Sequence, residues 1–561
     1  AGAGEAAAAP APRRTVPEIL AAVPLFAGLP AGAADALAER VRSTDLPAGE
    51  YLFHEGDPVG SVYIVAAGRL EGGAGDEVLR GLGPGDVVGE LALLAESPRS
   101  ASVRGRRDSR VLEIRRKDFN ALLAEEPDFA RALLRETGAQ LQASRALAAP
   151  DPDPGGTIAV IALDARAPLD DVVASLLDEL AAGGPATVMG PADRDDDAAR
   201  AELLERLERD HDHVVLAGRD GDPWAAFAAR QADRIVVVAG DADPPSGAAD
   251  RAELRGADLV VVSPRLGAAT PWLDALSPRA LHLVRPATAD RDRARAARRI
   301  AGRSVGIVFS GGGARAFAHI GVLDEFAAAG IEVDRVGGCS MGALIAAMSA
   351  LGMEPDEIDA RCYEEWVRRR PLTDYRIPRH SLIKGERIRA MLHRNLPGLI
   401  EDLERDFFCV SGDLVSGDLV VHRRGELYAA VGASMSLPGL VAPVALDGRL
   451  LVDGGVLNNL PVDVMAERSE GPVIAVDVTH QRFRNGAEEG SLTGFGETLT
   501  RALLLGSADV DALARTHAEL VIVPPDDGVG MLEFHQLDRA RLAGRRATVR
   551  ALEADSSWLP R

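Results

Sequence analysis

A serine flanked by glycines constrains the fold of this chain more than any other feature. In Gly338-Cys339-Ser340-Met341-Gly342, the serine stands between a β-type run and a helical pattern over residues 341–351. A sharp turn from strand to helix exposes a serine hydroxyl, and glycine on either side avoids clashes with neighbouring backbone. The motif therefore predicts an α/β domain in which Ser340 is a nucleophile.

Two further loops offer the other groups that ester hydrolysis requires. An apolar run over residues 305–309 ends in a glycine loop. Its backbone N–H groups can receive an oxyanion. Downstream, Asp453 begins an Asp-Gly-Gly turn and offers a carboxylate. A nucleophile, an anion cradle and an acid together make hydrolysis of an ester the first hypothesis.

The composition excludes several classes of protein. The net charge of -22, from 85 acidic and 63 basic residues, argues against general binding of nucleic acid. Three cysteines form neither a disulfide framework nor a metal-ligand cluster, which favours a reducing cytoplasm and no metal. No apolar run reaches the ~18 residues of a spanning helix, so any contact with a membrane is expected to be peripheral.

The pattern along the chain predicts a multidomain protein. Residues 46–114 alternate short β-type runs with glycine turns, which is typical of an antiparallel β-roll, here with flanking helices. Past a Pro/Gly-rich linker, strand-like runs alternate with helical segments, which predicts a parallel, Rossmann-like sheet. No P-loop follows its first strand, so a structural or coupling role is expected. The predicted parts are a disordered tail (1–15), a β-roll domain (16–147), the linker (148–156), a middle α/β domain (157–300), the α/β domain that carries Ser340 (304–480) and a helical extension packed on it (481–561).

A second motif lies within the β-roll. It consists of Gly89-Glu90-Leu91 followed by Pro98-Arg99-Ser100-Ala101-Ser102. A carboxylate can accept a hydrogen bond from a ribose hydroxyl, and an arginine beside a short helical turn can pair with a phosphate. The alternative is a solvated Glu/Arg pair on a loop.

Together with residues 46–50 and 53–57, this motif resembles the phosphate-binding cassette of cyclic nucleotide-binding domains. The resemblance implies that Glu90 holds the ribose and Arg99 the cyclic phosphate. The surrounding cradle would comprise Gly89, Leu91, Ala101 and Ser102. Ser100 follows the arginine where a hydroxyl is associated with cyclic GMP and alanine with cyclic AMP, and serine is small enough for either ligand.

The glycine loop, the serine motif and the Asp-Gly-Gly turn occur in the order that patatin-like phospholipases show. The resemblance covers roughly residues 304–478 and includes residues 318–323 and 433–439. It implies that Ser340 acts with Asp453 alone, without a cofactor. It also implies that the N–H groups of Gly311, Gly312 and Gly313 form the oxyanion hole and that Arg315 helps to fix that loop. The chain departs from the family at Ala316, where glycine is usual; the added methyl is tolerable if φ is negative.

A cyclic nucleotide-binding domain ahead of a patatin-like domain is similar to the bacterial relatives of neuropathy target esterase. This resemblance implies a phospholipase or lysophospholipase at the cytoplasmic membrane face, and regulation by cyclic AMP or cyclic GMP is a hypothesis. Two alternatives remain open. One is a general serine esterase or protease with a histidine base, for which His480, His517 and His535 are available. The other is a non-catalytic nucleotide sensor that recruits a membrane or partner.

A basic stretch over residues 366–394 stands out in this acidic chain. It contains nine basic residues and only two acidic ones, Asp374 and Glu386, with apolar residues interspersed. The stretch fits a surface for anionic headgroups. An ordinary charged, solvated face fits it equally well.

Overall fold

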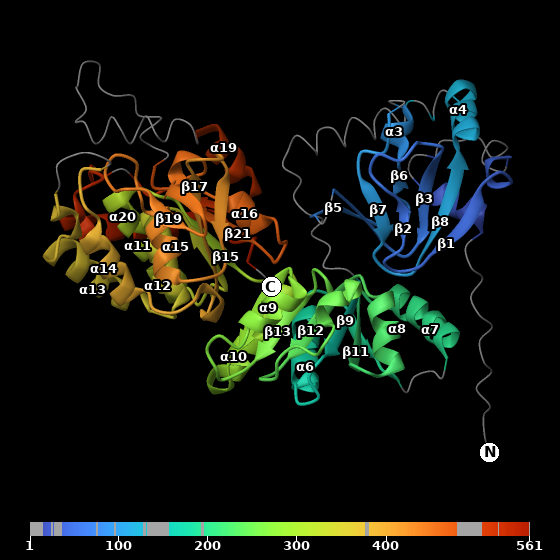
Figure 1. Cartoon of the computed structure of the whole chain (residues 1–561), viewed down its shortest axis with the longest axis horizontal. Coiled ribbons are helices and arrows are strands. Elements are labelled where there is room, and N and C mark those ends of the chain that lie inside the picture. The colour runs from blue at the N-terminus through green and yellow to red at the C-terminus, as the bar shows by residue number, and fades with distance from the viewer. Residues whose placement is uncertain are drawn as a thin grey trace. The chain divides into compact units, whose positions relative to one another are not determined.

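The computed structural model describes residues 15–23, 26, 36–74, 77–94, 97–126, 129, 131, 156–191, 196–375, 381–479, 508–525 and 527–559. The chain forms two compact units, residues 1–257 and 258–561, coloured blue to green and green to red in Figure 1. Most of the predicted tail, linker and helix after the β-roll lies outside the described residues, as does the beginning of the predicted extension.

The first unit begins with α1 (Val16–Ala22) and a β-roll of two antiparallel sheets, in the orders β1-β8-β3-β6 and β2-β7-β4-β5. Val62 and Ile64 pair with Ile114 and Leu112, and all four are buried because alternate residues face the core. The predicted antiparallel roll is confirmed. The strands are β1 (Arg42–Leu46), β2 (Tyr51–Phe53), β3 (Ser61–Ala67), β4 (Leu70–Ala74), β5 (Glu77–Leu82), β6 (Val87–Val88), β7 (Ser102–Gly105) and β8 (Ser109–Arg115), with helices α3 (Glu90–Leu94) and α4 (Arg116–Glu125).

Four parallel strands follow in the first unit, in the order β10-β11-β9-β12. Every residue of β9 is buried, which explains why its sequence is continuously apolar rather than alternating. The strands are β9 (Thr157–Ala162), β10 (Ala186–Met189), β11 (His213–Arg219) and β12 (Arg234–Ala239), and the helices between them are α6 (Leu169–Ala181), α7 (Asp197–Asp210) and α8 (Pro223–Gln231).

An ion cluster joins the β-roll to this parallel sheet within the first unit. Arg107, in the turn between β7 and β8, lies 2.7 Å from Glu208 and 3.2 Å from Asp233. The same two carboxylates hold Thr157, the first residue of β9: Asp233 accepts its N–H and Glu208 its hydroxyl. The roll is therefore fastened to the start of the central strand.

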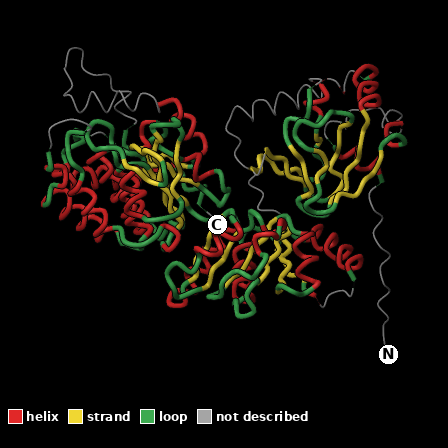
Figure 2. The backbone as a smooth tube through the Cα atoms, in the orientation of Figure 1, coloured by secondary structure: helices red, strands yellow, loops and turns green. Residues whose placement is uncertain are grey.

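The second unit opens with the parallel pair β13 (Asp258–Val262) and β14 (Ala280–Val284) and the helices α9 (Thr270–Leu276) and α10 (Ala289–Ile300). A larger sheet follows in the order β19-β20-β17-β16-β15-β21-β22, with β18 on β17. It is parallel from β17 to β22, and helices surround its strands (Figure 2). Its strands are β15 (Gly306–Phe309), β16 (Arg335–Gly338), β17 (Asp406–Asp413), β18 (Leu419–His422), β19 (Val444–Leu446), β20 (Arg449–Asp453), β21 (Val473–Val476) and β22 (Leu520–Ile522).

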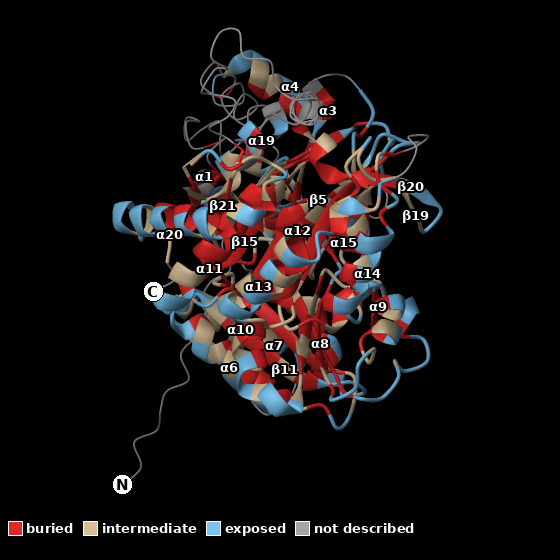
Figure 3. Cartoon of the chain, turned by 90° about the vertical axis from the view of Figure 1, so that its left-hand side faces the viewer, coloured by how far each residue is buried: buried red, intermediate tan, exposed pale blue. Residues whose placement is uncertain are grey.

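Both faces of this sheet are covered. On β15, Ile307 and Phe309 join one apolar core, whereas Val308 joins the core on the other face. The helices are α11 (Ala318–Ala328), α12 (Met341–Ala350), α13 (Pro355–Cys362), α14 (Glu386–Asn395), α15 (Leu427–Ser434), α16 (Val462–Ala466), α19 (Ala508–Ala514) and α20 (Leu537–Ala554). Every residue of α12 is buried, as Figure 3 shows, because this apolar helix lies inside the unit.

The long helix α20 packs tightly on α11. A β-carbon at Gly321 would collide with the backbone of α20, and one at Gly544 would collide with the carbonyl of Ala318. Glycine at both positions lets the two helices approach closely. Among the described residues, no helix has the length and apolar character that crossing a bilayer requires.

Candidate active site and nucleotide cassette

Ser340 occupies the turn between β16 and α12 that the sequence predicts. Its backbone has a φ of 55°, which is rare for a residue other than glycine and typical of a strained functional turn. A β-carbon at Gly342 would lie 2.5 Å from the carbonyl oxygens of Phe309 and Ser310. The close approach of β15 therefore explains why the motif needs glycine there.

Asp453 lies at the end of β20 and faces the serine. The Oγ of Ser340 donates a hydrogen bond to Oδ2 of Asp453 at 2.6 Å. The other carboxylate oxygen, Oδ1, accepts the N–H of Gly455 at 2.9 Å and the thiol of Cys339 at 3.5 Å. Each carboxylate oxygen thus has a defined donor, and Oδ2 is directed at the serine hydroxyl.

The carboxyl group of Asp453 is buried. Burial raises its pKa above the ordinary value, and the hydrogen bonds from Ser340, Gly455 and Cys339 partly oppose that shift. A carboxylate with a raised pKa is a better proton acceptor than one in water. The pair can therefore move the serine proton to Asp453 without a third group.

The glycine loop lies directly against the serine. A β-carbon at Gly311 would come within 3.1 Å of the β-carbon of Ser340. The N–H of Gly311 donates to the carbonyl of Asn459 at 3.2 Å, so this donor is already engaged. In the described part of the chain, the N–H groups of Gly312 and Gly313 have no protein acceptor, which leaves two of the three predicted donors for an oxyanion.

The structure answers the question raised by Ala316. Its φ is not positive, and its side chain packs in the apolar core, so the added methyl is accommodated without strain. Arg315 donates from Nε to the carbonyl of Gly312 at 3.3 Å, as expected of a residue that fixes the loop.

The histidine closest in sequence to the glycine loop has a structural position. His319 is fully buried, stacks on Phe309 and lies 2.9 Å from the carbonyl of Ser310 through Nε2. Burial lowers its pKa to about 4, so it is neutral at physiological pH. None of the described residues that line the cavity beside Ser340 is a histidine.

That cavity has a volume of about 80 Å³ and a mostly apolar lining. It contains residues that the sequence motifs do not indicate: Trp366, Met435, Met531, Leu532 and Phe534. Asn459 also lines the cavity. In the sequence, a pair of adjacent asparagines in the apolar run after Asp-Gly-Gly could have indicated this residue. Residues 531–534 carry no motif and reach the site only through the fold.

The nucleotide cassette forms one end of the β-roll. Glu90 is the first residue of α3 and is buried, as is Arg99. Gly89 has a φ of 89°, and a β-carbon there would collide with the guanidinium of Arg99. Of the remaining predicted residues, Ser100 is exposed, Ala101 is half-buried and Ser102 accepts the N–H of Glu55 at 2.9 Å. The fold thus brings the two halves of the motif together.

Arg99 is a buried cation held by backbone carbonyls and an aromatic ring. Arg99 donates to the carbonyls of Ser61 at 2.8 Å and Gly89 at 3.3 Å, and its guanidinium lies 3.9 Å above the ring of Phe53. Its Nε is buried without a partner, and burial lowers its pKa. Arg99 has no ion pair with any carboxylate in the described part of the chain, so a cyclic phosphate fits the chemistry of the site.

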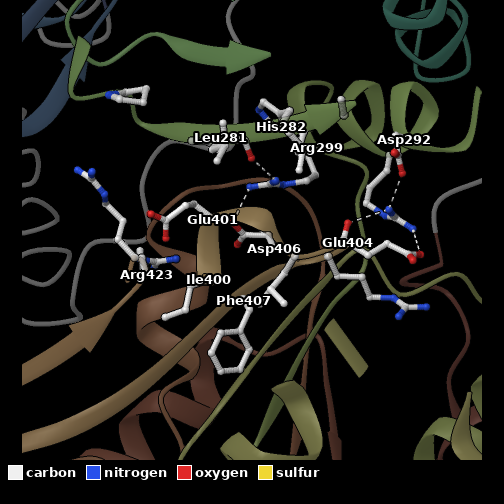
Figure 4. Close-up of a pocket in the computed structure, with 18 of the residues that line it drawn as sticks. Leu281, His282, Asp292, Arg299, Ile400, Glu401, Glu404, Asp406, Phe407 and Arg423 are labelled. Carbon is white, nitrogen blue, oxygen red and sulfur yellow. Dashed lines mark hydrogen bonds and ion pairs between the residues drawn. The ribbon is translucent and has the colours of Figure 1, made fainter. Parts of the chain in front are cut away.

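A second cavity of the second unit, about 220 Å³, lies among ion pairs rather than beside a nucleophile (Figure 4). Arg299 donates to the carbonyl of Leu281 at 2.8 Å and lies 3.2 Å from Asp406. Arg295 forms ion pairs with Asp292 and Glu404. These contacts tie α10 and β14 to the start of β17 in the larger sheet.

Comparison with known proteins identifies both parts of the chain. Residues 307–466 match the family described as patatin-like phospholipase, and residues 43–126 match the cyclic nucleotide-binding domain. The fold and the site thus define a patatin-like phospholipase domain preceded by a cyclic nucleotide-binding β-roll, and the predicted fold class is confirmed.

Relatives extend the similarity over most of the chain. An uncharacterized NTE family protein of Mycobacterium tuberculosis is 36% identical over 95% of both chains. The human patatin-like phospholipase domain-containing protein 6 is 28% identical over 82% of this chain and 39% of its own length. The neuropathy target esterase sws of Drosophila melanogaster is 27% identical over 82% of this chain and 37% of its own. The chain therefore belongs to the NTE family.

Proposed function

We propose that this protein is a serine-dependent lipid acyl hydrolase that acts on phospholipids or lysophospholipids. The observation that carries the proposal is the 2.6 Å hydrogen bond from Ser340 to Asp453 beside two unengaged backbone donors. The names of the human and Drosophila relatives, a phospholipase domain protein and an esterase, support the same class of reaction. The domain boundaries predicted from the sequence are part of this proposal.

The proposed reaction has two halves. Ser340 Oγ attacks the ester carbonyl while Asp453 accepts the proton, and the N–H groups of Gly312 and Gly313 stabilise the oxyanion. The alcohol leaves with that proton, and an acyl group remains on Ser340. Water then attacks the acyl-enzyme while Asp453 accepts the water proton. Ser340 Oγ leaves the tetrahedral intermediate with that proton, and the fatty acid is released.

A panel of phospholipids and lysophospholipids tests the proposed function. The full chain should release fatty acid from at least one of them, and a fluorophosphonate should label Ser340. A chain that neither hydrolyses any ester nor reacts with the fluorophosphonate would instead be a non-catalytic member of its family. Running each lipid with cyclic AMP, with cyclic GMP and without either gives the sign of any regulation.

The cassette is proposed to bind a cyclic nucleotide that regulates the hydrolase. Arg99 would pair with the cyclic phosphate and Glu90 would accept from the ribose hydroxyl. The ion cluster of Arg107 with Asp233 and Glu208 supports a coupling role for the middle region, because it ties the β-roll to the start of β9. A coupling of ~1–3 kcal/mol would change activity several-fold to a hundredfold.

Replacing Arg99 by alanine should weaken cyclic nucleotide binding by about 10- to 100-fold, because a hydrogen bond to a charged group is worth ~1.5–3 kcal/mol. Titration calorimetry with cyclic AMP and cyclic GMP measures the effect. Arg110 is the matched control, since it lies on β8 and pairs with the exposed Asp45. Equal affinities in the wild type and Arg99→Ala would show that the cassette does not recognise the phosphate.

We further propose that the basic stretch meets anionic headgroups at the cytoplasmic membrane face. Arg368 and Arg369 share Glu364 at 3.1 Å, and Arg370 has no carboxylate within 4 Å among the described residues. Tyr375, in the same stretch of sequence, is 73% exposed. Arg376 and Arg379 lie outside the described residues.

Charge reversal of Arg368, Arg369 and Arg370 together should weaken binding to anionic vesicles at least tenfold, because each cation near a lipid surface contributes ~1 kcal/mol. Sedimentation with vesicles of phosphatidylserine and phosphatidylcholine measures the change, and pure phosphatidylcholine vesicles provide the control. Unchanged sedimentation would mean that the stretch is an ordinary solvated face.

A further inference from the structure

One wall of the cavity beside Ser340 comes from a segment outside the matched patatin region of residues 307–466. Met531, Leu532 and Phe534 lie between β22 and α20 and line this cavity. The carbonyl of Met531 accepts the N–H of Ala314 at 2.8 Å, so the segment is bound directly to the oxyanion loop. Its position is therefore fixed relative to the nucleophile.

Phe534 is held on two sides by aromatic rings. It stacks on Trp366 with ring centroids 4.5 Å apart and an angle of 19°, and it meets the edge of Phe317 at 6.0 Å. Trp366 lies on a π-helical turn, η6 (Tyr363–Arg368), a rare geometry that is frequent at functional sites. Trp366 and Phe534 are both buried and line the cavity. Paired rings of this kind form a rigid wall.

The volume left by this wall is small. An apolar cavity of ~150 Å³ holds benzene, so the 80 Å³ beside Ser340 accommodates only about three or four heavy atoms. A short acyl chain fits within that space. The rest of a long chain must lie outside this space, because the stacked rings limit its depth on one side.

We propose that the stacked rings of Trp366 and Phe534 set the acyl-chain preference of the site. Short acyl chains fit beside the stacked rings, and removing a ring makes room for more of a long chain. This inference rests on the proposed function of Ser340 as the nucleophile.

The test compares kcat/KM for p-nitrophenyl butyrate and p-nitrophenyl laurate in the full chain. Phe534→Ala should raise the laurate-to-butyrate ratio about tenfold or more, because a few methylenes of pocket space change specificity by that amount. Phe534→Leu, which keeps an apolar side chain, should raise the ratio less. Trp366→Phe, which keeps a smaller ring in the stack, should also raise the ratio less than Phe534→Ala does.

Trp558→Leu is the matched control. Its ring stacks on Phe326 at 6.2 Å and does not line the cavity, so the ratio should stay at the wild-type value. Fluorophosphonate labelling of Ser340 and a thermal melt establish that each variant is folded and competent. If Phe534→Ala and Phe534→Leu are folded and labelled but keep the wild-type ratio, this inference is wrong and the proposed function is unaffected. Failure of the wild type to hydrolyse butyrate or to label would overturn the proposed function and the inference together.

Discussion

Replacing Ser340 by alanine is expected to lower the rate of ester hydrolysis by about 10⁴-fold or more, as loss of a catalytic nucleophile does in other hydrolases. The alanine variant loses the hydroxyl that donates to Asp453 and can no longer form an acyl-enzyme. Release of fatty acid or of a chromogenic alcohol measures the rate. Fluorophosphonate labelling should disappear in parallel.

Asp453→Asn should be nearly as inactive but should not be destabilised. The amide retains the shape of the carboxylate and cannot take the serine proton. Because burial raises the folded-state pKa of Asp453, ionisation of this carboxyl opposes folding above that pKa, and stability rises as the pH falls through it. The neutral amide avoids this cost, so the melting temperature at neutral pH should equal or exceed that of the wild type.

The raised pKa of Asp453 also determines how the expected wild-type activity depends on pH. Only the ionised carboxylate accepts a proton, so kcat/KM should fall as the pH drops through a value above the ordinary pKa of an aspartate.

His517→Gln and His535→Gln should keep the wild-type rate, since neither histidine lines the cavity. A large loss of rate in either variant would favour a histidine-dependent triad instead.

Glu470→Gln is expected to destabilise the second unit by about 3–5 kcal/mol, the usual cost of removing one partner from a buried ion pair. Glu470 is fully buried and accepts two hydrogen bonds from Arg299, at 2.8 and 3.2 Å. Burial opposes its ionisation, but Arg299, Arg468 and Arg335 outweigh that effect and hold its pKa well below the ordinary value. The substitution leaves these cations without their carboxylate.

The melting temperature of that unit should fall by about 5–15 °C, measured by calorimetry at neutral pH. Because the pKa of Glu470 is depressed in the folded state, its ionisation stabilises the fold above the unfolded-state pKa. That stability is lost as the pH falls through the folded-state pKa. Glu332→Gln is the matched control. Its carboxylate is 42% exposed and lies 3.0 Å from Arg298, so its loss should cost less than ~1 kcal/mol. Equal losses in the two variants would contradict the structural role of Glu470.

Much of the fold is predictable from local patterns. The continuous apolar run of β9 marks a fully buried parallel strand, whereas β10 is only partly buried, with Val188 41% exposed. Ser340 and Asp453 can also be predicted from the sequence. Each lies in a short glycine-containing turn whose geometry only a few residue types allow.

The rest of the site depends on contacts between residues distant in the sequence. The N–H of Gly311 is engaged by Asn459, and the oxyanion loop is supported by Met531, yet no local pattern predicts either contact. Trp366 faces Phe534 because a helix widens into a π turn, a change that apolar periodicity does not reveal. Motifs therefore predict the reacting groups, and the tertiary fold determines the space around them.

The hydrogen bond from Ala314 to Met531 has a consequence for the nascent chain. The ribosome makes the oxyanion loop more than two hundred residues before its supporting segment. At 5–20 residues per second, the loop waits about 10–40 s for Met531 and for the helix that packs on α11. A growing chain thus already contains Ser340 and Asp453 but lacks the completed site. Unfinished chains should accordingly be inert toward the lipids of the cell that makes them.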